Sequence, residues 1–314
     1  MRQVLILSIF LLPVFFSCKK QNADSSNNPV DTLATGWKKI VLSEPADLVD
    51  IFFINNTGFA ISSNAIFKSA DGGNNWSRSA TITSGTGLDN IGMGNEMNAV
   101  FVSHPNRLVS THNGGSSFDT ATLADSYLTD VFFVSSMVAY AAGKSIWKTI
   151  DGGYNWTKLH DFTISAYYNS LYFLNEQTGW VIRTGGLYKT INGGVDWQPI
   201  STPTFDLNTT RDVFFLNSNT GYISDELSVG KTTDAGATWS KAFMGVPTYH
   251  DIHFVTDNIG YLTDGPRIYK TANGGNTWTK EVALVTSSLI ELHLTDINHG
   301  WACGPGGIVL KFNQ

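Results

Sequence analysis

Residues Lys148–Trp156 have the sequence KTIDGGYNW, and near copies of this nine-residue segment, here called a box, recur along the chain. The other five boxes are Lys68–Trp76 (KSADGGNNW), Ser110–Phe118 (STHNGGSSF), Lys189–Trp197 (KTINGGVDW), Lys231–Trp239 (KTTDAGATW) and Lys270–Trp278 (KTANGGNTW). Their fourth places, at positions 71, 113, 151, 192, 234 and 273, lie 42, 38, 41, 42 and 39 residues apart. A period of this length predicts one repeat domain rather than two unrelated halves.

Four short strands are expected around each box, because runs of apolar and β-branched residues alternate with turn residues. In the first repeat these strands are 48–54, 59–62, 65–69 and 76–80. First strands of this kind recur seven times, although there are only six boxes. The expected first strands are 48–54, 90–94, 130–134, 170–174, 212–216, 251–255 and 291–295.

The seventh repeat ends at its third-strand position, residues 306–311, so its fourth strand must come from elsewhere. The segment Gly36–Ile40 (GWKKI) is similar to Asn155–Leu159 (NWTKL), which follows a box. An N-terminal strand around Trp37 would therefore close the last sheet and remove an open edge. The predicted fold is all-β, a seven-bladed β-propeller of four-stranded blades spanning residues 37–314.

Each box is expected to fasten a turn between the third and fourth strands of a blade. The Asp or Asn at the fourth place accepts hydrogen bonds from turn N–H groups, a glycine at the sixth place supplies unusual backbone angles, and the closing aromatic packs between blades. We favour this packing role for the tryptophans over sugar stacking. The residues assigned to it are Asp71, Asn113, Asp151, Asn192, Asp234, Asn273, Trp76, Trp156, Trp197, Trp239 and Trp278.

The N-terminus is typical of an export signal. Arg2 precedes an apolar run of 13 residues, Val4–Phe16, which is too short to span a bilayer as a helix. Cys18 follows Ser17 as in a bacterial lipobox, so we expect residues 1–17 to be a lipoprotein-type signal peptide and Cys18 to carry the lipid. Phe15 departs from the usual Leu, Val or Ile, which leaves simple secretion as the alternative. Residues 18–36 are polar and suit a flexible tether.

The charge of the chain excludes some partners. With 20 Lys and Arg against 26 Asp and Glu the net charge is −6, and removal of Arg2 with the signal peptide makes it 19 − 26 = −7. Nucleic acid would demand a basic surface, so we expect none as a partner. Cys303 is the one cysteine besides Cys18, so no internal disulfide is expected. No cofactor or metal motif is present, and we expect a monomer that touches the membrane only through its lipid.

The pattern Ser/Thr-x-Asp-x-Gly-x-x-Trp, present as Thr149–Trp156, resembles the Asp-box, or BNR, repeat. The larger unit in 212–239, DVFFLN followed by TGY and KTTDAGATW, is similar to the photosystem II stability/assembly factor family and its non-photosynthetic bacterial relatives. The resemblance extends over about residues 37–314, with Asn replacing Asp in three boxes. It implies a seven-bladed propeller that acts as a binding or assembly platform without enzyme activity or cofactor. The expected partner is a protein of the cell envelope.

Asp-boxes also occur in sialidases, so a carbohydrate-binding or glycoside-hydrolase propeller is the alternative function. Sialidase chemistry needs three arginines to hold a carboxylate, an acid/base carboxylate and a Tyr paired with a Glu. The chain after the signal peptide has Arg78, Arg107, Arg183, Arg211 and Arg267, but no Phe-Arg-Ile-Pro segment before the first box. The scaffold function is therefore preferred.

One position of the first strands is mostly acidic. It holds Asp50, Asn90, Asp130, Ser170, Asp212, Asp251 and Glu291, spaced by 40, 40, 40, 42, 39 and 40 residues. In a propeller these side chains would surround the mouth of the central channel, where they would attract a cation or a basic partner. The alternative, which we prefer, is that each carboxylate bonds its own strand start or the neighbouring loop. Arg211 and His250 lie next to two of these acids and would neutralise part of the ring.

Other candidate positions lie outside or beside the repeat. The face opposite the boxes carries the variable links, and its aromatic residues outside the repeat positions are the best candidates for contact with a partner. These are Tyr127, Tyr167, Tyr168, Phe205 and Tyr249. His253 and His293 replace aromatic residues of the first strands, where packing is favoured over a metal pair. One lysine in each of six repeats (68, 148, 189, 231, 270 and 311) predicts a solvated face.

Overall fold

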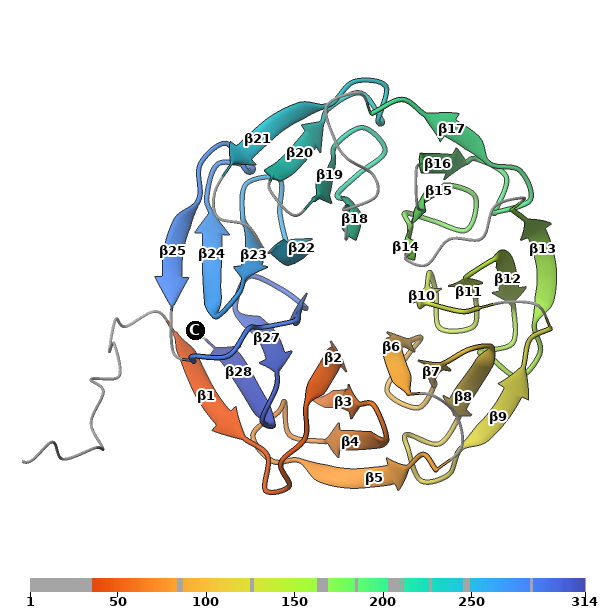
Figure 1. The fold of residues 1–314 in the computed structure, drawn as a ribbon, viewed down its shortest axis with the longest axis vertical. Helices are drawn as coiled ribbons and strands as arrows, with labels where there is room; N and C mark the ends of the chain where they lie inside the picture. Colours follow the sequence, from red (N-terminus) through yellow and green to blue (C-terminus); the bar gives the residue numbers. More distant parts are fainter. Residues whose placement is uncertain are drawn as a thin grey trace, which may run out of the picture. The chain divides into compact units, whose positions relative to one another are not determined.

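The computed structural model describes residues 36–83, 87–124, 127–162, 169–183, 186–202, 210, 212–225, 228–244, 249–282 and 285–313. These residues form 28 β-strands, and no helix occurs among them. Accordingly, the described part of the chain has no helix that could cross a membrane. Seven antiparallel four-stranded sheets follow one another around a ring (Figure 1). The predicted seven-bladed propeller is confirmed.

The blades are numbered here along the chain. Blade 1 contains β2 (Leu48–Ile54), β3 (Thr57–Ser62), β4 (Ala65–Ser69) and β5 (Ser77–Thr81); blade 2 contains β6 (Leu88–Met93), β7 (Ala99–Ser103), β8 (Arg107–Thr111) and β9 (Asp119–Thr122). Blade 3 contains β10 (Asp130–Phe133), β11 (Ala139–Ala142), β12 (Ser145–Thr149) and β13 (Thr157–Asp161); blade 4 contains β14 (Asn169–Phe173), β15 (Gly179–Arg183), β16 (Gly186–Thr190) and β17 (Gln198–Ile200). Blade 5 contains β18 (Asp212–Phe215), β19 (Gly221–Ser224), β20 (Ser228–Thr232) and β21 (Ser240–Met244); blade 6 contains β22 (Tyr249–Phe254), β23 (Gly260–Asp264), β24 (Arg267–Thr271) and β25 (Thr279–Val282).

Blade 7 joins the two ends of the propeller. Its strands are β26 (Glu291–Leu294), β27 (His299–Gly304), β28 (Ile308–Asn313) and β1 (Trp37–Val41), in the order β1-β28-β27-β26. β1 is antiparallel to β28, with Trp37 opposite Phe312 and Val41 opposite Ile308. The predicted closure by the Trp37 strand is therefore confirmed. Because β1 comes from the start of the propeller and β28 from its end, their pairing closes the ring.

The core lies between blades rather than in one central mass. An aromatic ring of the second strand of one blade stacks on a first-strand Phe of the next blade. Examples are Trp180 on Phe215 at 3.5 Å, Tyr140 on Phe173 at 3.7 Å and Tyr222 on Phe254 at 3.8 Å between ring centroids. Five of the interfaces also receive a box tryptophan, such as Trp239, which lies edge-on to Phe215 at 6.1 Å; Phe118 and Trp37 take this place in the other two. Packing is thus the role of these aromatic side chains.

The boxes form tight turns held by their own side chains. In the blade 3 box, Asp151 Oδ1 accepts hydrogen bonds from Thr149 Oγ1 at 2.7 Å and from the Asn155 N–H at 2.9 Å. Gly153 has φ of 104°, which side chains other than glycine rarely adopt, and its carbonyl accepts a 3.1 Å bond from Trp156 Nε1. Because this bond draws the tryptophan into the turn, the fourth strand begins one residue after it, at Thr157.

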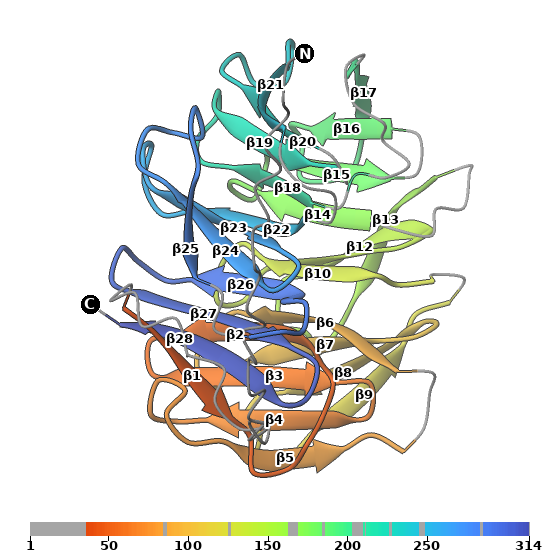
Figure 2. The ribbon, with the colours of Figure 1, turned by 60° about the vertical axis from the view of Figure 1, so that its left-hand side comes forward.

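The boxes and the turns between first and second strands share one face of the ring, here called the box face. The Gly152 N–H, for example, donates to the Met137 carbonyl in the first turn of the same blade at 2.8 Å. The links between second and third strands, and from each fourth strand to the next blade, lie on the other face, here called the loop face. The turned view of Figure 2 shows the strands running between these two faces.

The prediction of a solvated lysine ladder was wrong. Lys148 and Lys189 lie 5.1 Å and 5.2 Å from the centroids of the Tyr140 and Trp180 rings, and Lys311 is 9% exposed. Lys311 Nζ donates to Asn74 Oδ1 at 3.0 Å, and Lys231 Nζ donates to the Gly274 carbonyl, in both cases in the box of the next blade. Because the next box lies within reach of a lysine stem, the ammonium group joins two blades instead of entering solvent.

Candidate functional site

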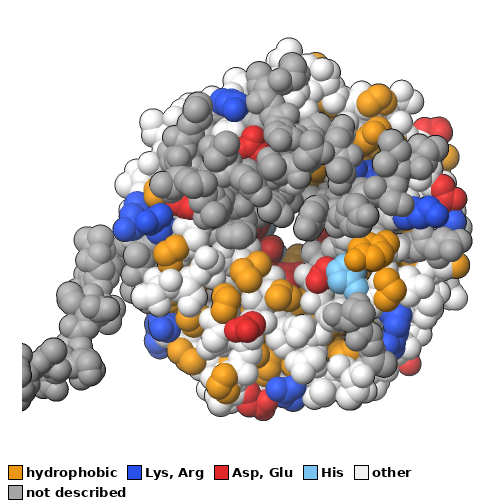
Figure 3. Space-filling view, viewed as in Figure 1, with side chains coloured by type: hydrophobic (Ala, Val, Ile, Leu, Met, Phe, Trp, Pro, Cys, Tyr) orange, Lys and Arg blue, Asp and Glu red, His pale blue; other side chains and the backbone are white. Residues whose placement is uncertain are grey.

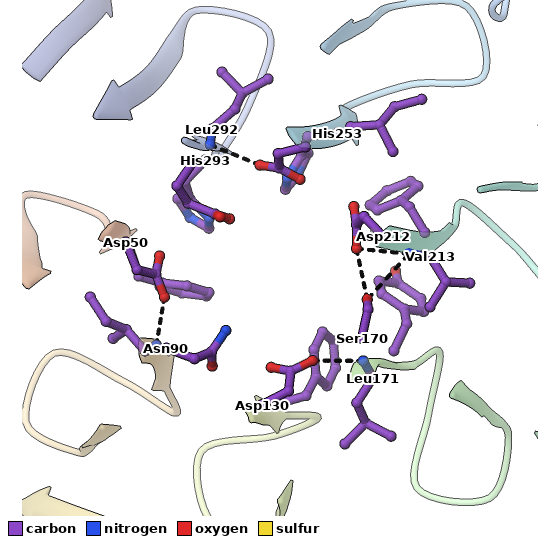
Figure 4. A pocket seen from close by; sticks show the side chains of 18 of the residues that line it. Asp50, Asn90, Asp130, Ser170, Leu171, Asp212, Val213, His253, Leu292 and His293 are labelled. Atoms are coloured by element: carbon purple, nitrogen blue, oxygen red, sulfur yellow. Dashed lines mark hydrogen bonds between the residues drawn. The ribbon is translucent and has the colours of Figure 1, made fainter. Parts of the chain in front are cut away.

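The seven aligned first-strand positions meet around one cavity on the ring axis. Its volume is about 560 Å³, and it is lined by Asp50, Asn90, Asp130, Ser170, Asp212, Asp251 and Glu291 together with their neighbours. Figure 3 shows acidic side chains inside the central opening, and Figure 4 shows the carboxylates from several strands pointing inward. Since the first strands start from the loop face, these side chains, here called the acid ring, surround the mouth of the channel on that face.

The acid ring is also a belt of hydrogen bonds between blades. Asp50 Oδ2 accepts from the Ile91 N–H at 2.6 Å, and Asp130 Oδ2 accepts from the Leu171 N–H at 2.6 Å. Asp251 Oδ2 accepts from the Leu292 N–H at 2.8 Å. In each case the donor is the next blade's first strand (Figure 4). The preferred hypothesis of bonded carboxylates is thus confirmed in part. Asp212 Oδ1 accepts from the N–H of Val213 in its own strand at 2.7 Å, as expected, but the other partners lie in the adjacent inner strand and not in a loop.

The two neutral members of the ring make the same type of bond. Asn90 Oδ1 accepts from the Val131 N–H at 3.0 Å, and Ser170 Oγ accepts from the Val213 N–H at 3.2 Å. Ser170 Oγ in turn donates to Asp212 Oδ1 at 2.8 Å. A negative charge is therefore not needed for the belt itself, since an amide or hydroxyl oxygen serves equally as acceptor.

Burial raises the pKa of every acidic member of the ring. The pKa of Asp50 rises to about 8 and that of Asp130 to about 7, because loss of water around the carboxylate outweighs the N–H bonds that favour its charge. The pKa values of Asp212, Asp251 and Glu291 are raised as well, first by burial. Neighbouring carboxylates add to this effect, since like charges so close cannot all ionise. The ring therefore holds protons near neutral pH.

A second belt, of aromatic rings, lies two residues further along the first strands. Phe132, Tyr172 and Phe214 follow one another with centroid distances of 5.1 Å and 5.2 Å. The belt continues through His253 and His293 to Phe52, with His293 and Phe52 centroids 4.0 Å apart. Blade 2 has Gly92 at this position, so the belt is open there. The channel is thus acidic at its mouth and aromatic below.

The two histidines belong to this packing. Their centroids lie 5.6 Å apart with the rings nearly perpendicular, and His293 Nε2 is 3.0 Å from the Phe53 carbonyl oxygen. Burial lowers the pKa of His253 to about 3 and that of His293 to about 4, so both are neutral at physiological pH. Among the described residues, no group of three or more His, Cys, Asp or Glu side chains is arranged to hold a metal ion.

Tyr127 is the one predicted loop aromatic whose side chain is described, and it is 49% exposed on the loop face. Its ring lies 5.3 Å from that of His104, which is paired with Asp89 through Nε2. This hydrogen bond raises the pKa of His104. The sequence pattern gives no indication of Asp89 and His104, because neither falls at a repeated position and only folding brings them together.

Several predicted residues lie outside the described part of the chain. These are Cys18, Tyr167, Tyr168, Phe205 and Arg211, together with residues 1–17 and most of the 18–36 tether. Tyr249 and His250 begin β22, but their side chains are also outside it. Neutralisation of the acid ring by Arg211 or His250 therefore stays a prediction.

The arginines with described contacts are dispersed. Arg78 pairs with Glu44 at 2.7 Å, Arg267 with Asp264 at 3.4 Å, and Arg183 lies 3.7 Å above the centre of the Phe162 ring. These three belong to blades 1, 6 and 4, so they do not converge on one carboxylate. Cys303 is a buried free thiol.

The geometry defines a seven-bladed β-propeller with an acid-lined axial cavity. No protein-family model matches the sequence, and no curated protein is significantly similar to it. Solved structures are similar: YCF48 bound to D1 peptide has a TM-score of 0.76 and 18% identity, covering 89% of this chain and 97% of that one. YCF48 from Cyanidioschyzon merolae has a TM-score of 0.72 and 18% identity, covering 88% and 98%.

Enzymes also use this architecture. A catalytically inactive virginiamycin B lyase from Staphylococcus aureus, solved with quinupristin, has a TM-score of 0.74 and 12% identity, covering 88% of this chain and 99% of that one. At such identities the likeness shows the fold, and the site must carry any argument about function.

Proposed function

We propose that this protein is a non-enzymatic binding platform that holds a protein partner on its loop face and receives a basic side chain of that partner in the acid ring. The observation that carries the proposal is the axial cavity of about 560 Å³, which has carboxyl groups at its mouth and aromatic rings below. A Lys or Arg side chain fits this order, because its charged end is attracted by carboxylates and its stem packs on apolar or aromatic surface.

A solved structure with a similar fold supports a protein partner. One solved propeller with the same architecture, YCF48, was captured with a D1 peptide. Here the exposed Tyr127 beside the Asp89–His104 pair would offer a further contact on the loop face. Tyrosine is common in protein interfaces because it presents a large rigid surface at low entropic cost.

Binding of a cation should be coupled to release of protons. The ring carboxyls hold protons near neutral pH, since burial raises the pKa of Asp50 to about 8 and that of Asp130 to about 7. A bound ammonium or guanidinium group favours the ionised carboxylate and lowers these pKa values. Affinity is therefore expected to rise between pH 6 and pH 8.5.

The test uses a fluorescein-labelled Gly-Ser peptide with two Lys residues and the same peptide with Gln in their place. Anisotropy should report binding of the Lys peptide alone, weakened about tenfold in an Asp130→Asn/Asp251→Asn variant, which keeps the acceptor oxygens. An Asp257→Asn/Asp296→Asn variant, which loses the same number of carboxyl groups from exposed box-face turns, is the matched control. Equal affinity of both variants and the wild type at every pH would refute the proposal.

We also propose that the protein is exported and anchored by lipid on Cys18, with residues 1–17 removed and residues 18–36 as a tether. The support is the lipobox-like sequence around Ser17-Cys18. Cys303 is the one other cysteine of the chain. A Cys18→Ala variant should be released from the membrane fraction after export. If the variant stayed membrane-bound, the lipid anchor would be excluded.

A further inference from the structure

Exposed apolar side chains gather on the box face. Of the nine large hydrophobic side chains exposed among the described residues, Val41 and Tyr127 lie at the loop face. The other seven lie in boxes or in turns between first and second strands, and six of these belong to blades 2–4. The six are Met97, Met137, Ile150, Tyr154, Ile191 and Val195, here called the box-face patch; the seventh is Ile297 in blade 7.

The repeat itself provides a control for these positions. Met97 and Met137 occupy the turn position whose carbonyl accepts the box N–H, at 2.9 Å and 2.8 Å. The same bond is made by Asn56, Gln177, Asn219 and Asn258 in other blades. Because the bond uses the backbone oxygen, the fold is indifferent to the side chain. The turn therefore does not require an exposed methionine side chain at either position.

The box residues of the patch follow the same rule. At the seventh place of the box, Asn74 and Asn276 donate a side-chain hydrogen bond to a carbonyl of their own box, at 2.7 Å and 2.9 Å. Tyr154 and Val195 stand at this place in blades 3 and 4 and are 59% and 49% exposed. Val195 has no polar atom that could make this local bond. Exposed apolar side chains that replace a hydrogen-bonding residue of the turn are typical of an interaction site.

The patch is continuous from blade to blade. Tyr154 stacks on the His112 ring of the blade 2 box at a centroid distance of 3.5 Å. Asn98 of blade 2 lies 4.0 Å from the Met137 sulfur of blade 3, and His160 of blade 3 lies 3.1 Å from the Val195 carbonyl of blade 4. Ile191 and Ile200 then line a hollow of about 340 Å³ together with Lys189, Asn192, Asp196 and Gln198. An apolar side chain would fit this hollow.

The fully exposed charged side chains next to the patch are acidic, whereas the lysines that border it, Lys68, Lys148 and Lys189, are half-buried. Glu96, Glu176 and Asp196 are exposed beside Met97, Gln177 and Val195. The lysines of the same boxes, Lys148 and Lys189, are half-buried over the Tyr140 and Trp180 rings and so are held against the propeller. A second copy of this chain would bring acidic rims together, and anionic lipid would be repelled as well.

From the apolar centre and acidic rim we infer a second interface: the box-face patch of blades 2–4 binds a protein segment that presents aliphatic side chains flanked by Lys or Arg. This interface is separate from the acid ring, which opens on the other face. A platform with two faces can hold two partners at once, so the inference does not depend on the proposed ligand of the ring.

The test uses full-length protein carrying Asp130→Asn/Asp251→Asn, so that Lys binding in the acid ring is weakened, and the variants below are made in this parent protein. The probes are two labelled synthetic peptides, one alternating Leu with Lys and the other Leu with Glu. The Lys peptide should bind, and an Ile150→Ser/Ile191→Ser variant should weaken it at least tenfold while its thermal midpoint stays near that of the parent protein. Ile297→Ser, which removes an exposed isoleucine from the same face in blade 7, is the matched control and should bind as the parent protein does.

Four outcomes of the peptide-binding experiment would overturn the inference. They are unchanged binding by the Ile150→Ser/Ile191→Ser variant, an equal loss in Ile297→Ser, equal binding of the Glu peptide, or no binding of the Lys peptide. Sedimentation velocity and flotation with phosphatidylcholine vesicles distinguish other occupants. Self-association or vesicle binding that the double variant abolishes would assign the patch to a second copy or to lipid, and would equally overturn it.

Discussion

Asp50 Oδ2 accepts a 2.6 Å hydrogen bond from the backbone N–H of Ile91, which lies in the next blade. Two blades are thereby joined at the channel by a carboxyl group that carries a proton near neutral pH. The bond needs an acceptor oxygen, whereas the proton affinity reflects burial. These two properties can be separated by mutation, because Asn90 makes the equivalent bond to Val131 with an amide oxygen.

An Asp50→Asn variant should be more stable than the wild type at alkaline pH. The folded pKa of Asp50, about 8, lies above its ordinary value of 3.8, so its contribution to stability is full below about pH 4 and is lost as pH rises to 8. The amide has no proton to lose. The advantage of Asp50→Asn in the free energy of unfolding should therefore grow on the order of 1 kcal/mol per pH unit between pH 5 and 8.

Urea unfolding at several pH values checks this expectation. An Asp50→Ala variant is the control, because it removes both the titrating carboxyl and the acceptor and leaves the Ile91 N–H unpaired, at a cost relative to Asp50→Asn of about 1–3 kcal/mol at every pH. A parallel pH dependence for wild type and Asp50→Asn would show that Asp50 titrates normally and would contradict the expectation.

The box turn of blade 3 gives a second prediction. Asp151→Ala removes the acceptor of the Asn155 N–H and of Asn155 Nδ2, at 2.9 Å and 2.8 Å, and should lower the free energy of unfolding by about 1–3 kcal/mol. Asp151→Asn should cost less than about 1 kcal/mol, since Asn113, Asn192 and Asn273 accept the equivalent N–H bond at 2.9–3.0 Å. Chemical unfolding measures both; equal losses would mean that charge, and not hydrogen bonding, holds the turn.

The box spacing and the sequence around Trp37 were enough to predict the number of blades and their closure. Both signals are local. Each box turn depends on its own residues, and the last repeat lacks a fourth strand, which the sequence around Trp37 can supply. The same period located the acid ring, because residues at equal places in successive first strands must face the same axis. The period gives no information on how close a side chain of one blade lies to the next blade. Lys311 was therefore assigned to solvent, although Asn74 of the next box lies within 3.0 Å.

The protonation state of the acid ring also could not be predicted from the sequence. Whether Asp50 holds its proton depends on how closely Asp130 and the other ring members approach and how much water remains, and both are properties of the closed propeller. The Asp89–His104 pair and the box-face patch were missed for a related reason. They are departures from the repeat, and one chain gives no indication of which departures come together in space.

The closure of the ring leads to a third prediction. Trp37 is 7% exposed and packs against Phe312 and Tyr261, with centroid distances of 5.2 Å and 6.2 Å. Trp37→Ala should cost about 3–5 kcal/mol, the range for truncating a buried tryptophan. Because β28 is the strand with which β1 pairs, hydrogen exchange should accelerate first in these two strands. Trp278→Ala, at a box inside the chain, is the control and should not accelerate exchange in β1; uniform acceleration in both variants would contradict a seam at blade 7.

His253 supplies a prediction of opposite sign to that of Asp50. Its folded pKa is lowered from 6.5 to about 3 by burial, so its contribution to stability is present above pH 6.5 and is lost as pH falls toward 3. Phe52, Phe132 and Phe214 occupy the same place in other blades, and therefore His253→Phe should fit the belt. Relative to the wild type, the variant should gain roughly 2 kcal/mol at pH 5 over its difference at pH 7. Thermal unfolding at both pH values tests this gain, and NMR tests its cause. The His253 imidazole resonance should not titrate between pH 5 and pH 8. An inflection near 6.5 for His253 would mean that water reaches the aromatic belt, and the expected gain would then vanish.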